Sequence, residues 1–208
     1  MYLTRMALDI SKPDTMKAFL SPNLFHGAIE KAFPGDRARN LWRIDSLRGE
    51  RYLLIVSEKV PDLSNAVRQF GKQGEEVETR DYSSFIRRLQ DNSTWRFRLV
   101  ANPSITTDVG NRHRVVSHVT VHYQKKWLMD RAEKNGFLLY DDDFDVIWKN
   151  RYSFYKSDRN HVQFTAVAYE GTLTIANKEL FGKVLESGIG RERAYGMGMM
   201  TVAGVSRA

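Results

Sequence analysis

The order of strand and helix patterns in the first half of this chain restricts its fold more than any other feature of the sequence. One segment has a clear strand pattern, because its aromatic and aliphatic residues alternate with Arg96 and Arg98, as in a strand with one buried face. A helix begins at Ser21-Pro22 and ends at Pro34-Gly35, since serine caps a helix and proline fits its first turn. The patterns follow the order strand, helix, strand, strand, helix, strand, at residues 2–8, 22–33, 40–46, 51–57, 63–70 and 95–101.

This order is that of a ferredoxin-like, or RRM-like, fold, in which helices pack on an antiparallel sheet. The second half is also mixed α and β, with a helix pattern at 122–135, another at 177–186 and strand patterns between them. Residues 102–112 are interpreted as a linker. We therefore expect an α+β protein with two domains of about a hundred residues, at 1–103 and 113–208.

The composition favours a polyanionic partner. The chain has 208 residues, with 32 Lys and Arg against 25 Asp and Glu, and a net charge of +7. Such a balance points first to nucleic acid and second to an anionic membrane surface. No basic amphipathic helix and no membrane-spanning run stand out, so we expect no membrane partner. The absence of cysteine excludes disulfides and thiolate metal sites and, with no signal-peptide pattern, favours a cytoplasmic location.

A stretch rich in glycine and arginine lies near the C-terminus, at 188–200, between a helix pattern and a strand pattern. Glycines allow a backbone to approach a ligand closely, and guanidinium groups match phosphate geometry. We therefore interpret the stretch as a phosphate-binding loop, with the candidates Gly190, Arg191, Arg193 and Gly196. The alternative is that the glycines only cap a helix and tighten a turn. A small-molecule enzyme would also fit the glycines but would leave the basic charge unexplained.

His26 is the leading catalytic candidate. It lies one residue beyond Phe25 of the apolar stripe of its helix, so its side chain points off that stripe. Histidine transfers protons near neutral pH. Attack of a ribose 2′-hydroxyl on the adjacent phosphate needs a base, an acid for the leaving 5′-oxygen and cations at the phosphate. One histidine with lysine or arginine could perform this reaction without a metal. The alternative is a surface histidine with no role.

Two other groups of residues invite a metal-site interpretation. His118 and His122 are four residues apart, but the residues between them favour a strand, in which such side chains lie about 13 Å apart. An acidic run at 141–143, with Asp145, could serve a metal-dependent nuclease, but such a run is more often a solvated turn. We therefore expect no metal site.

Basic residues recur through the chain and supply candidates for RNA contacts. Arg96 and Arg98 share one face of their strand. Two strand patterns in the second half are joined by a basic tip at 156–160, as in a β-hairpin, and this tip contributes Lys156 and Arg159. The chain lacks the aromatic-rich strand motif of RNA-recognition domains, so we do not expect the ordinary stacking of single-stranded bases.

Several motifs together resemble the CasE family of CRISPR repeat-processing endoribonucleases, over nearly the whole chain. They are a Met-Tyr-Leu start, a histidine in the first helix and the segments Phe97–Pro103, Tyr169–Leu173 and Gly188–Gly198. The resemblance implies two tandem ferredoxin-like domains. It also implies metal-independent cleavage of CRISPR precursor RNA at the base of the repeat hairpin. In that reaction a 2′-hydroxyl attacks, which leaves a 2′,3′-cyclic phosphate and a mature guide RNA.

The resemblance further implies that the protein stays with other subunits of the Cascade complex and uses no cofactor. His26 would be the general acid or base. The candidate RNA contacts are Arg96, Arg98, Asn102, Lys156, Arg159, Gly190, Arg191, Arg193 and Gly196. Relatives carry a tyrosine three residues before the histidine, where this chain has Asn23, and Gly27 stands where relatives can carry a basic residue. The alternative function is therefore a non-catalytic subunit that binds structured RNA.

Overall fold

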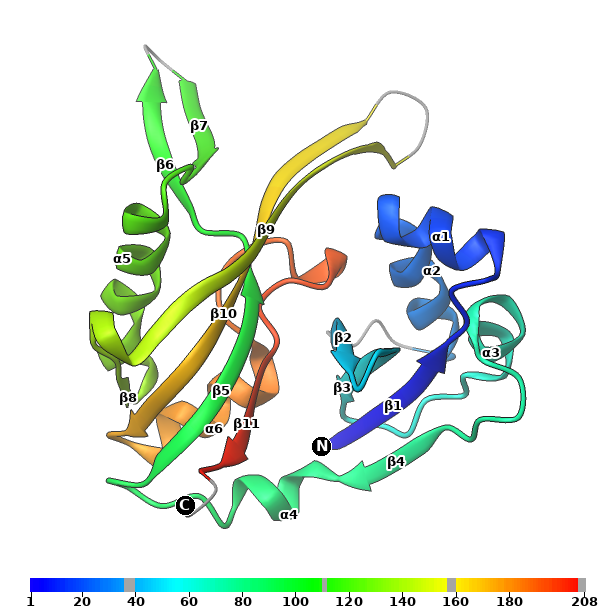
Figure 1. Cartoon of the computed structure of the whole chain (residues 1–208), viewed down its shortest axis with the longest axis horizontal. Coiled ribbons are helices and arrows are strands. Elements are labelled where there is room, and N and C mark those ends of the chain that lie inside the picture. Colours follow the sequence, from blue (N-terminus) through cyan, green and yellow to red (C-terminus); the bar gives the residue numbers. More distant parts are fainter. Residues whose placement is uncertain (36–39, 110–111, 157–159, 206–208) are drawn as a thin grey trace.

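The computed structural model describes residues 1–35, 40–109, 112–156 and 160–205. Within them the chain forms a four-stranded sheet, a five-stranded sheet and a separate two-stranded ribbon. The two larger sheets belong to two units that lie side by side, each with its own helices (Figure 1). None of the helices in the described ranges is long and apolar enough to cross a membrane.

The first unit has a ferredoxin-like fold. Its antiparallel sheet has the strand order β2-β3-β1-β4. The elements are β1 (Tyr2–Leu8), α1 (Pro13–Leu20), α2 (Asn23–Lys31), β2 (Leu41–Leu47), β3 (Glu50–Ser57), α3 (Ser64–Phe70) and β4 (Glu78–Asp81). The helix α1 was not among the predicted elements, and Pro13 occupies its first turn.

The fourth strand of the first sheet is β4, so the prediction that residues 95–101 fill this place is wrong. β4 is a short strand of polar, largely exposed residues at the edge of the sheet. Such an edge strand needs no apolar face, so it carries no hydrophobic pattern and resembles a loop in the sequence. The predicted strand is β5 (Thr94–Ala101), which pairs with β10 (His161–Ile175) and β11 (Met200–Gly204). The second unit therefore begins before β5 rather than at residue 113.

The second unit repeats the fold with additions. Its sheet has the order β11-β5-β10, and β8 and β9 both pair with the remaining edge of β10. The remaining elements are α4 (Tyr82–Ile86), β6 (Ser104–Val109), β7 (Arg112–Ser117), α5 (Val121–Ala132), η1 (Glu133–Asn135), β8 (Phe137–Leu138), η2 (Asp141–Asp143), β9 (Phe144–Tyr155), α6 (Lys178–Ser187) and η3 (Arg193–Tyr195). The expected α+β class with two tandem ferredoxin-like domains is confirmed.

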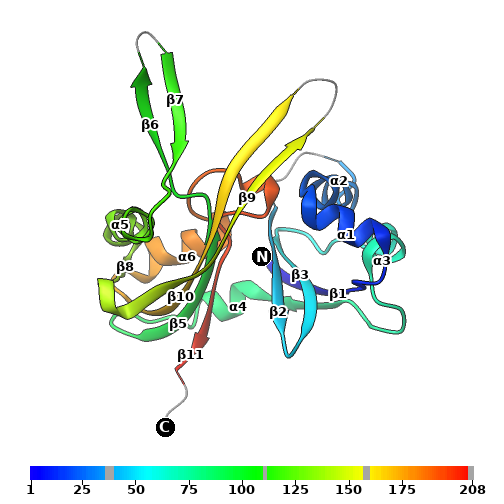
Figure 2. The same cartoon turned by 45° about the horizontal axis from the view of Figure 1, so that its top comes forward.

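Residues 102–112 do not form the predicted linker. Most of them belong to the ribbon of β6 and β7, in which Ile105 lies opposite Val116. Both side chains are about half exposed, so the ribbon has no buried face that would give an apolar alternation. The ribbon and the β9–β10 hairpin project from the same end of the molecule (Figure 2).

The two units share apolar packing. In the first unit α1, α2 and α3 bury the apolar side of the sheet, with Phe25 and Phe70 at its centre. In the second unit α5 and α6 cover one face of the sheet, and Leu41 and Val56 of the first sheet join that core. A third cluster, which includes Tyr195, lies on the other face of the second sheet. The junction of the units is therefore a packed interface.

A buried arginine also joins the two units. Arg43 on β2 is 1% exposed, and its Nη1 donates to the backbone oxygens of Arg98, at 2.9 Å, and Met199, at 2.8 Å. Its Nη2 pairs with Asp45 at 2.5 Å. Burial lowers the pKa of the Arg43 guanidinium, and Asp45 opposes that shift. Because the ordinary arginine pKa is so high, the group stays charged and depends on Asp45 for compensation.

Candidate active site and nucleic-acid interface

The helix α2 places His26 at the boundary between the units. Phe25 and Ile29 are buried in the first core, and this orientation turns His26 off the apolar face, as predicted. The turn η3 of the glycine-rich loop packs against α2, and the ring of Tyr195 meets the ring of His26 edge-on, with 6.3 Å between centroids. The structure therefore brings together the predicted catalytic histidine and the predicted phosphate-binding loop from opposite ends of the chain.

Two phenylalanine rings of the second unit also pack against Tyr195. Its ring stacks on Phe164 at 5.7 Å and meets Phe154 edge-on at 5.2 Å. Burial raises the pKa of the Tyr195 phenol, and the neighbouring Glu192 carboxylate raises it further. The phenol is therefore protonated at neutral pH and can donate a hydrogen bond. Sequence reasoning missed this residue, because nothing local relates it to a histidine in the first helix.

Asn23, at the position where the resemblance implies a tyrosine, faces a different part of the molecule. It lines a cavity of ≈ 470 Å³ together with Lys31 of α2 and with Asn65 and Gln69 of α3. Its Oδ1 is buried and has no hydrogen-bond partner among the described residues. An amide cannot transfer a proton at neutral pH. In this chain the phenol in contact with His26 is that of Tyr195.

Tight packing requires the glycines of the 188–200 loop. Gly190 has φ +87°, and a Cβ there would lie 3.0 Å from the Trp127 ring. Gly196 has φ +82°, and a Cβ there would lie 2.9 Å from the Trp42 ring. The alternative interpretation of these glycines, as residues that allow tight turns, thus accounts for them without a ligand.

We expect Gly196→Ala to destabilise the fold by about 2–4 kcal/mol, because it adds left-handed backbone strain and a clash with Trp42. Gly27→Ala is the matched control. Nothing lies within 4 Å of a Cβ at Gly27, and alanine in a helix is favoured over glycine by about 0.5–1 kcal/mol. Urea unfolding of both variants measures the difference, and equal stabilities would contradict the packing role of Gly196.

The arginines of the loop lie near the surface. Arg191 is exposed and donates to a threonine of β6 at 3.1 Å. Arg193 is half-buried, and its Nη1 donates to the carbonyl of Ser187 at 2.6 Å, at the end of α6. Asn102 is 2% exposed, forms a β-bridge with Arg191 and accepts a hydrogen bond from Ser117. Asn102 therefore holds the loop to the base of the ribbon.

The other predicted RNA contacts are scattered. Arg96 on β5 and Lys156 at the end of the β9–β10 hairpin are both exposed. Arg98 forms ion pairs with two carboxylates, at 2.8 Å and 2.6 Å, so its charge is compensated within the protein. Arg159 lies outside the described residues.

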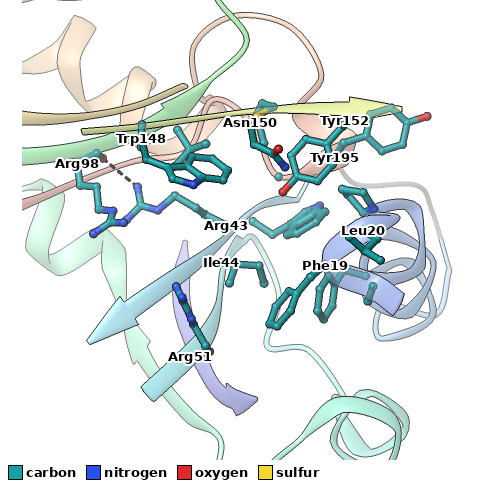
Figure 3. A pocket seen from close by; sticks show the side chains of 18 residues that line it. Phe19, Leu20, Arg43, Ile44, Arg51, Arg98, Trp148, Asn150, Tyr152 and Tyr195 are labelled. Atoms are coloured by element: carbon teal, nitrogen blue, oxygen red, sulfur yellow. Dashed lines mark hydrogen bonds between the residues drawn. The ribbon is translucent and has the colours of Figure 1, made fainter. Parts of the chain in front are cut away.

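A cavity of ≈ 480 Å³ lies between the two units beside Tyr195, and we call it the interdomain cleft (Figure 3). Aromatic and arginine side chains from both units line it. They are Phe19, Phe25, Trp42, Trp148, Tyr152, Tyr195, Arg43, Arg51 and Arg98. Sequence reasoning missed the cleft because its residues come from several separate segments. Trp148 and Tyr152 are four residues apart on β9 and therefore share one face of that strand, which was a local sign of an aromatic surface.

The residues considered for a metal have other partners. Lys125 pairs with Asp141 at 3.3 Å and with Asp145 at 3.6 Å, so one cation already lies between these two carboxylates. His118 precedes α5 and stacks on Tyr123 at 5.9 Å. Within the described ranges, no three His, Asp or Glu residues come close enough to hold a metal ion.

The structure has two tandem ferredoxin-like units, with a histidine and a glycine-rich loop at their junction. This arrangement agrees with the resemblance of the sequence motifs to CRISPR-associated proteins. The sequence profile of the family described as CRISPR associated protein matches residues 1–204. The chain therefore belongs to the CRISPR-associated protein family, as the resemblance implied.

Relatives match over their full length. The CRISPR-associated endoribonuclease Cse3 of Thermus thermophilus is 24% identical over 216 residues, which cover 98% of this chain and 100% of Cse3. A structure of Cse3 bound to an RNA representing a pre-cleavage complex has a TM-score of 0.79 at 24% identity, with 97% of this chain and 98% of that one covered. A chain of a CRISPR RNA-guided surveillance complex has a TM-score of 0.69 at 22% identity, with 99% and 100% covered. These solved structures share the fold of this chain.

Proposed function

We propose that this protein is a metal-independent endoribonuclease that cleaves CRISPR precursor RNA at the base of the repeat hairpin. The observation that carries the proposal is the contact between His26 and Tyr195 at the junction of the two units. The full-length similarity to Cse3, which is named as an endoribonuclease, supports this reaction. The net charge of +7 supports a polyanionic substrate.

In the proposed reaction a ribose 2′-hydroxyl loses its proton and attacks the adjacent phosphorus while the bond from phosphorus to the 5′-oxygen breaks. The products are a 2′,3′-cyclic phosphate and a 5′-hydroxyl, and the 5′-oxygen gains one proton as the 2′-oxygen loses one. His26 transfers one of these protons. Tyr195 holds the imidazole ring from the side and, as a protonated phenol, offers a donor nearby. Arg191 and Arg193 supply positive charge for the phosphate.

Single-turnover cleavage of a cognate repeat hairpin in EDTA tests this proposal. We expect the wild-type protein to cut and to leave a cyclic phosphate. Binding without any cutting, with or without metal, would favour the alternative of a non-catalytic subunit that binds structured RNA. Cutting only after magnesium is restored would favour a metal-dependent nuclease, and loss of that activity in Asp141→Asn would assign it to the acidic run.

We expect Arg193→Ala to weaken RNA binding and to reduce the magnitude of the negative slope of log affinity against log salt by about 1, the value for one phosphate contact. Arg68→Ala is the matched control, because Arg68 is an exposed arginine on α3 whose side chain donates to Asn65 of the same helix. Fluorescence anisotropy at several salt concentrations measures both slopes. An unchanged slope for Arg193→Ala would remove this residue from the phosphate contacts.

We also propose that the protein acts in the cytoplasm as a subunit of a CRISPR RNA-guided complex. The similarity to a chain of such a complex supports the assembly. The absence of cysteine fits a reducing compartment. Co-purification of the untagged protein with tagged partner subunits from the native host tests the assembly.

A further inference from the structure

The interdomain cleft contains an exposed tryptophan ring. Trp148 on β9 is 45% exposed although it lines the cleft. Asn150 and Tyr152 lie on the same face of β9, because residues alternate along a strand. Beside Trp148, the neighbouring strand β10 carries the small Ala168. The sheet therefore forms a hollow in which a large ring is available for contact.

The first unit forms the opposite wall of this hollow. Phe19 and Leu20 at the end of α1, and Ile44 on β2, face Tyr152 and Tyr195 across the cleft (Figure 3). Leu20 is 76% exposed, so this wall is also open to contact. Apolar and aromatic walls on two sides suit a flat, aromatic ligand that stacks on a ring.

The charge at the cleft identifies the rest of the ligand. Arg43 and Arg98 both pair with Asp45, and Arg98 also pairs with Glu170, so two carboxylates compensate these two cations. Arg51 on β3 also lines the cleft and is exposed, and no carboxylate in the described parts of the chain forms an ion pair with it. A cation beside stacking rings matches a base with its phosphate, and the amide of Asn150 can bond to a base edge. A purely apolar ligand would leave these polar groups unused.

We propose that the interdomain cleft binds one unpaired nucleotide of the substrate RNA, next to the cleaved phosphate. The base stacks on Trp148, and its phosphate contacts Arg51. The volume of ≈ 480 Å³ lies within the range of small-ligand sites, about 300–1,000 Å³. Tyr195 lines this cleft and also contacts His26, so the bound nucleotide adjoins the proposed catalytic site. The inference rests on the proposed function and adds a subsite to it.

The experiment compares a blunt repeat hairpin with hairpins that carry one unpaired 2-aminopurine nucleotide at the 5′ or the 3′ side of the stem. The full-length protein is used, and anisotropy gives the affinities. We expect the extra nucleotide on one side to strengthen wild-type binding by about ten-fold, because base stacking on an aromatic ring has this effect. Binding should also quench the 2-aminopurine fluorescence. Trp148→Ala should abolish the gain and the quenching, and Trp148→Phe should keep most of the gain.

In Arg51→Ala the gain in affinity from the extra nucleotide should be several-fold smaller than in the wild type. In the control Arg68→Ala the gain should be unchanged. Equal wild-type affinity for blunt and extended hairpins would overturn the cleft proposal while the hairpin is still bound and cut. An equal loss of affinity for both hairpins in Trp148→Ala would also overturn it. If the wild-type protein binds neither hairpin, both the proposed function and the cleft proposal fail.

Discussion

Replacing His26 with alanine is expected to lower the single-turnover rate of repeat-RNA cleavage by about 10²–10⁴-fold, the usual contribution of a general acid or base. RNA affinity should change by less than about two-fold, because the imidazole acts on protons that move only in the transition state. Gel assays in EDTA measure the rate, and fluorescence anisotropy measures the affinity.

His113→Ala is the matched control for this prediction. His113 lies on the ribbon strand β7, its side chain is 82% exposed, and it pairs with Asp108. We expect this variant to cut at the wild-type rate. Cleavage by His26→Ala at the wild-type rate would show that another group transfers the proton. A loss of affinity as large as the loss of rate would show that His26 acts in binding.

Replacing Asp45 with alanine is expected to destabilise the protein by about 3–5 kcal/mol, the usual cost of removing one partner from a buried ion pair. Among the described residues, Asp45 is the carboxylate that pairs with Arg43, which is 1% exposed. Without it the buried cation keeps only neutral acceptors, which are two backbone carbonyls and the hydroxyl of Thr201. Because these acceptors belong to the second unit, the junction of the units should weaken as well. Urea unfolding monitored by tryptophan fluorescence measures the change.

Asp14→Ala is the control for a surface ion pair. Asp14 lies 4.0 Å from Lys17 on α1, and both side chains are exposed. Exposed pairs contribute little to stability, so we expect no measurable shift of the urea midpoint. If Asp45→Ala had the same midpoint as Asp14→Ala, Arg43 would not depend on its carboxylate partner.

Elements with a strong apolar period could be predicted from the sequence. The helix predicted at 22–33 is α2, and the strands predicted at 40–46 and 51–57 are β2 and β3, each displaced by only a residue or two at most ends. In these segments the apolar residues that define the period also fill the core. The polar edge strand β4 and the two-sided ribbon were not predictable in this way, because neither has a buried face.

In the candidate site, too, the features set by local geometry could be predicted, and those set by distant contacts could not. The orientation of His26 could be predicted, because helical geometry alone turns it away from Phe25. Tyr195 and Arg43 could not be recognised, because each acquires its role from a partner in the other unit. A glycine-rich loop with arginines suggested a ligand, whereas the glycines meet the rings of Trp42 and Trp127.

The sequence by itself determined the α+β class, the basic charge, the family and the position of the candidate histidine, because these follow from composition, motifs and local periodicity. Only the tertiary structure decided that β5 belongs to the second sheet, that Tyr195 lies against His26 and that an aromatic cleft separates parts of the two units. The reason is physical. Strand pairing and contacts between distant segments depend on how whole elements pack, and a local pattern of residues is the same whichever sheet the strand joins.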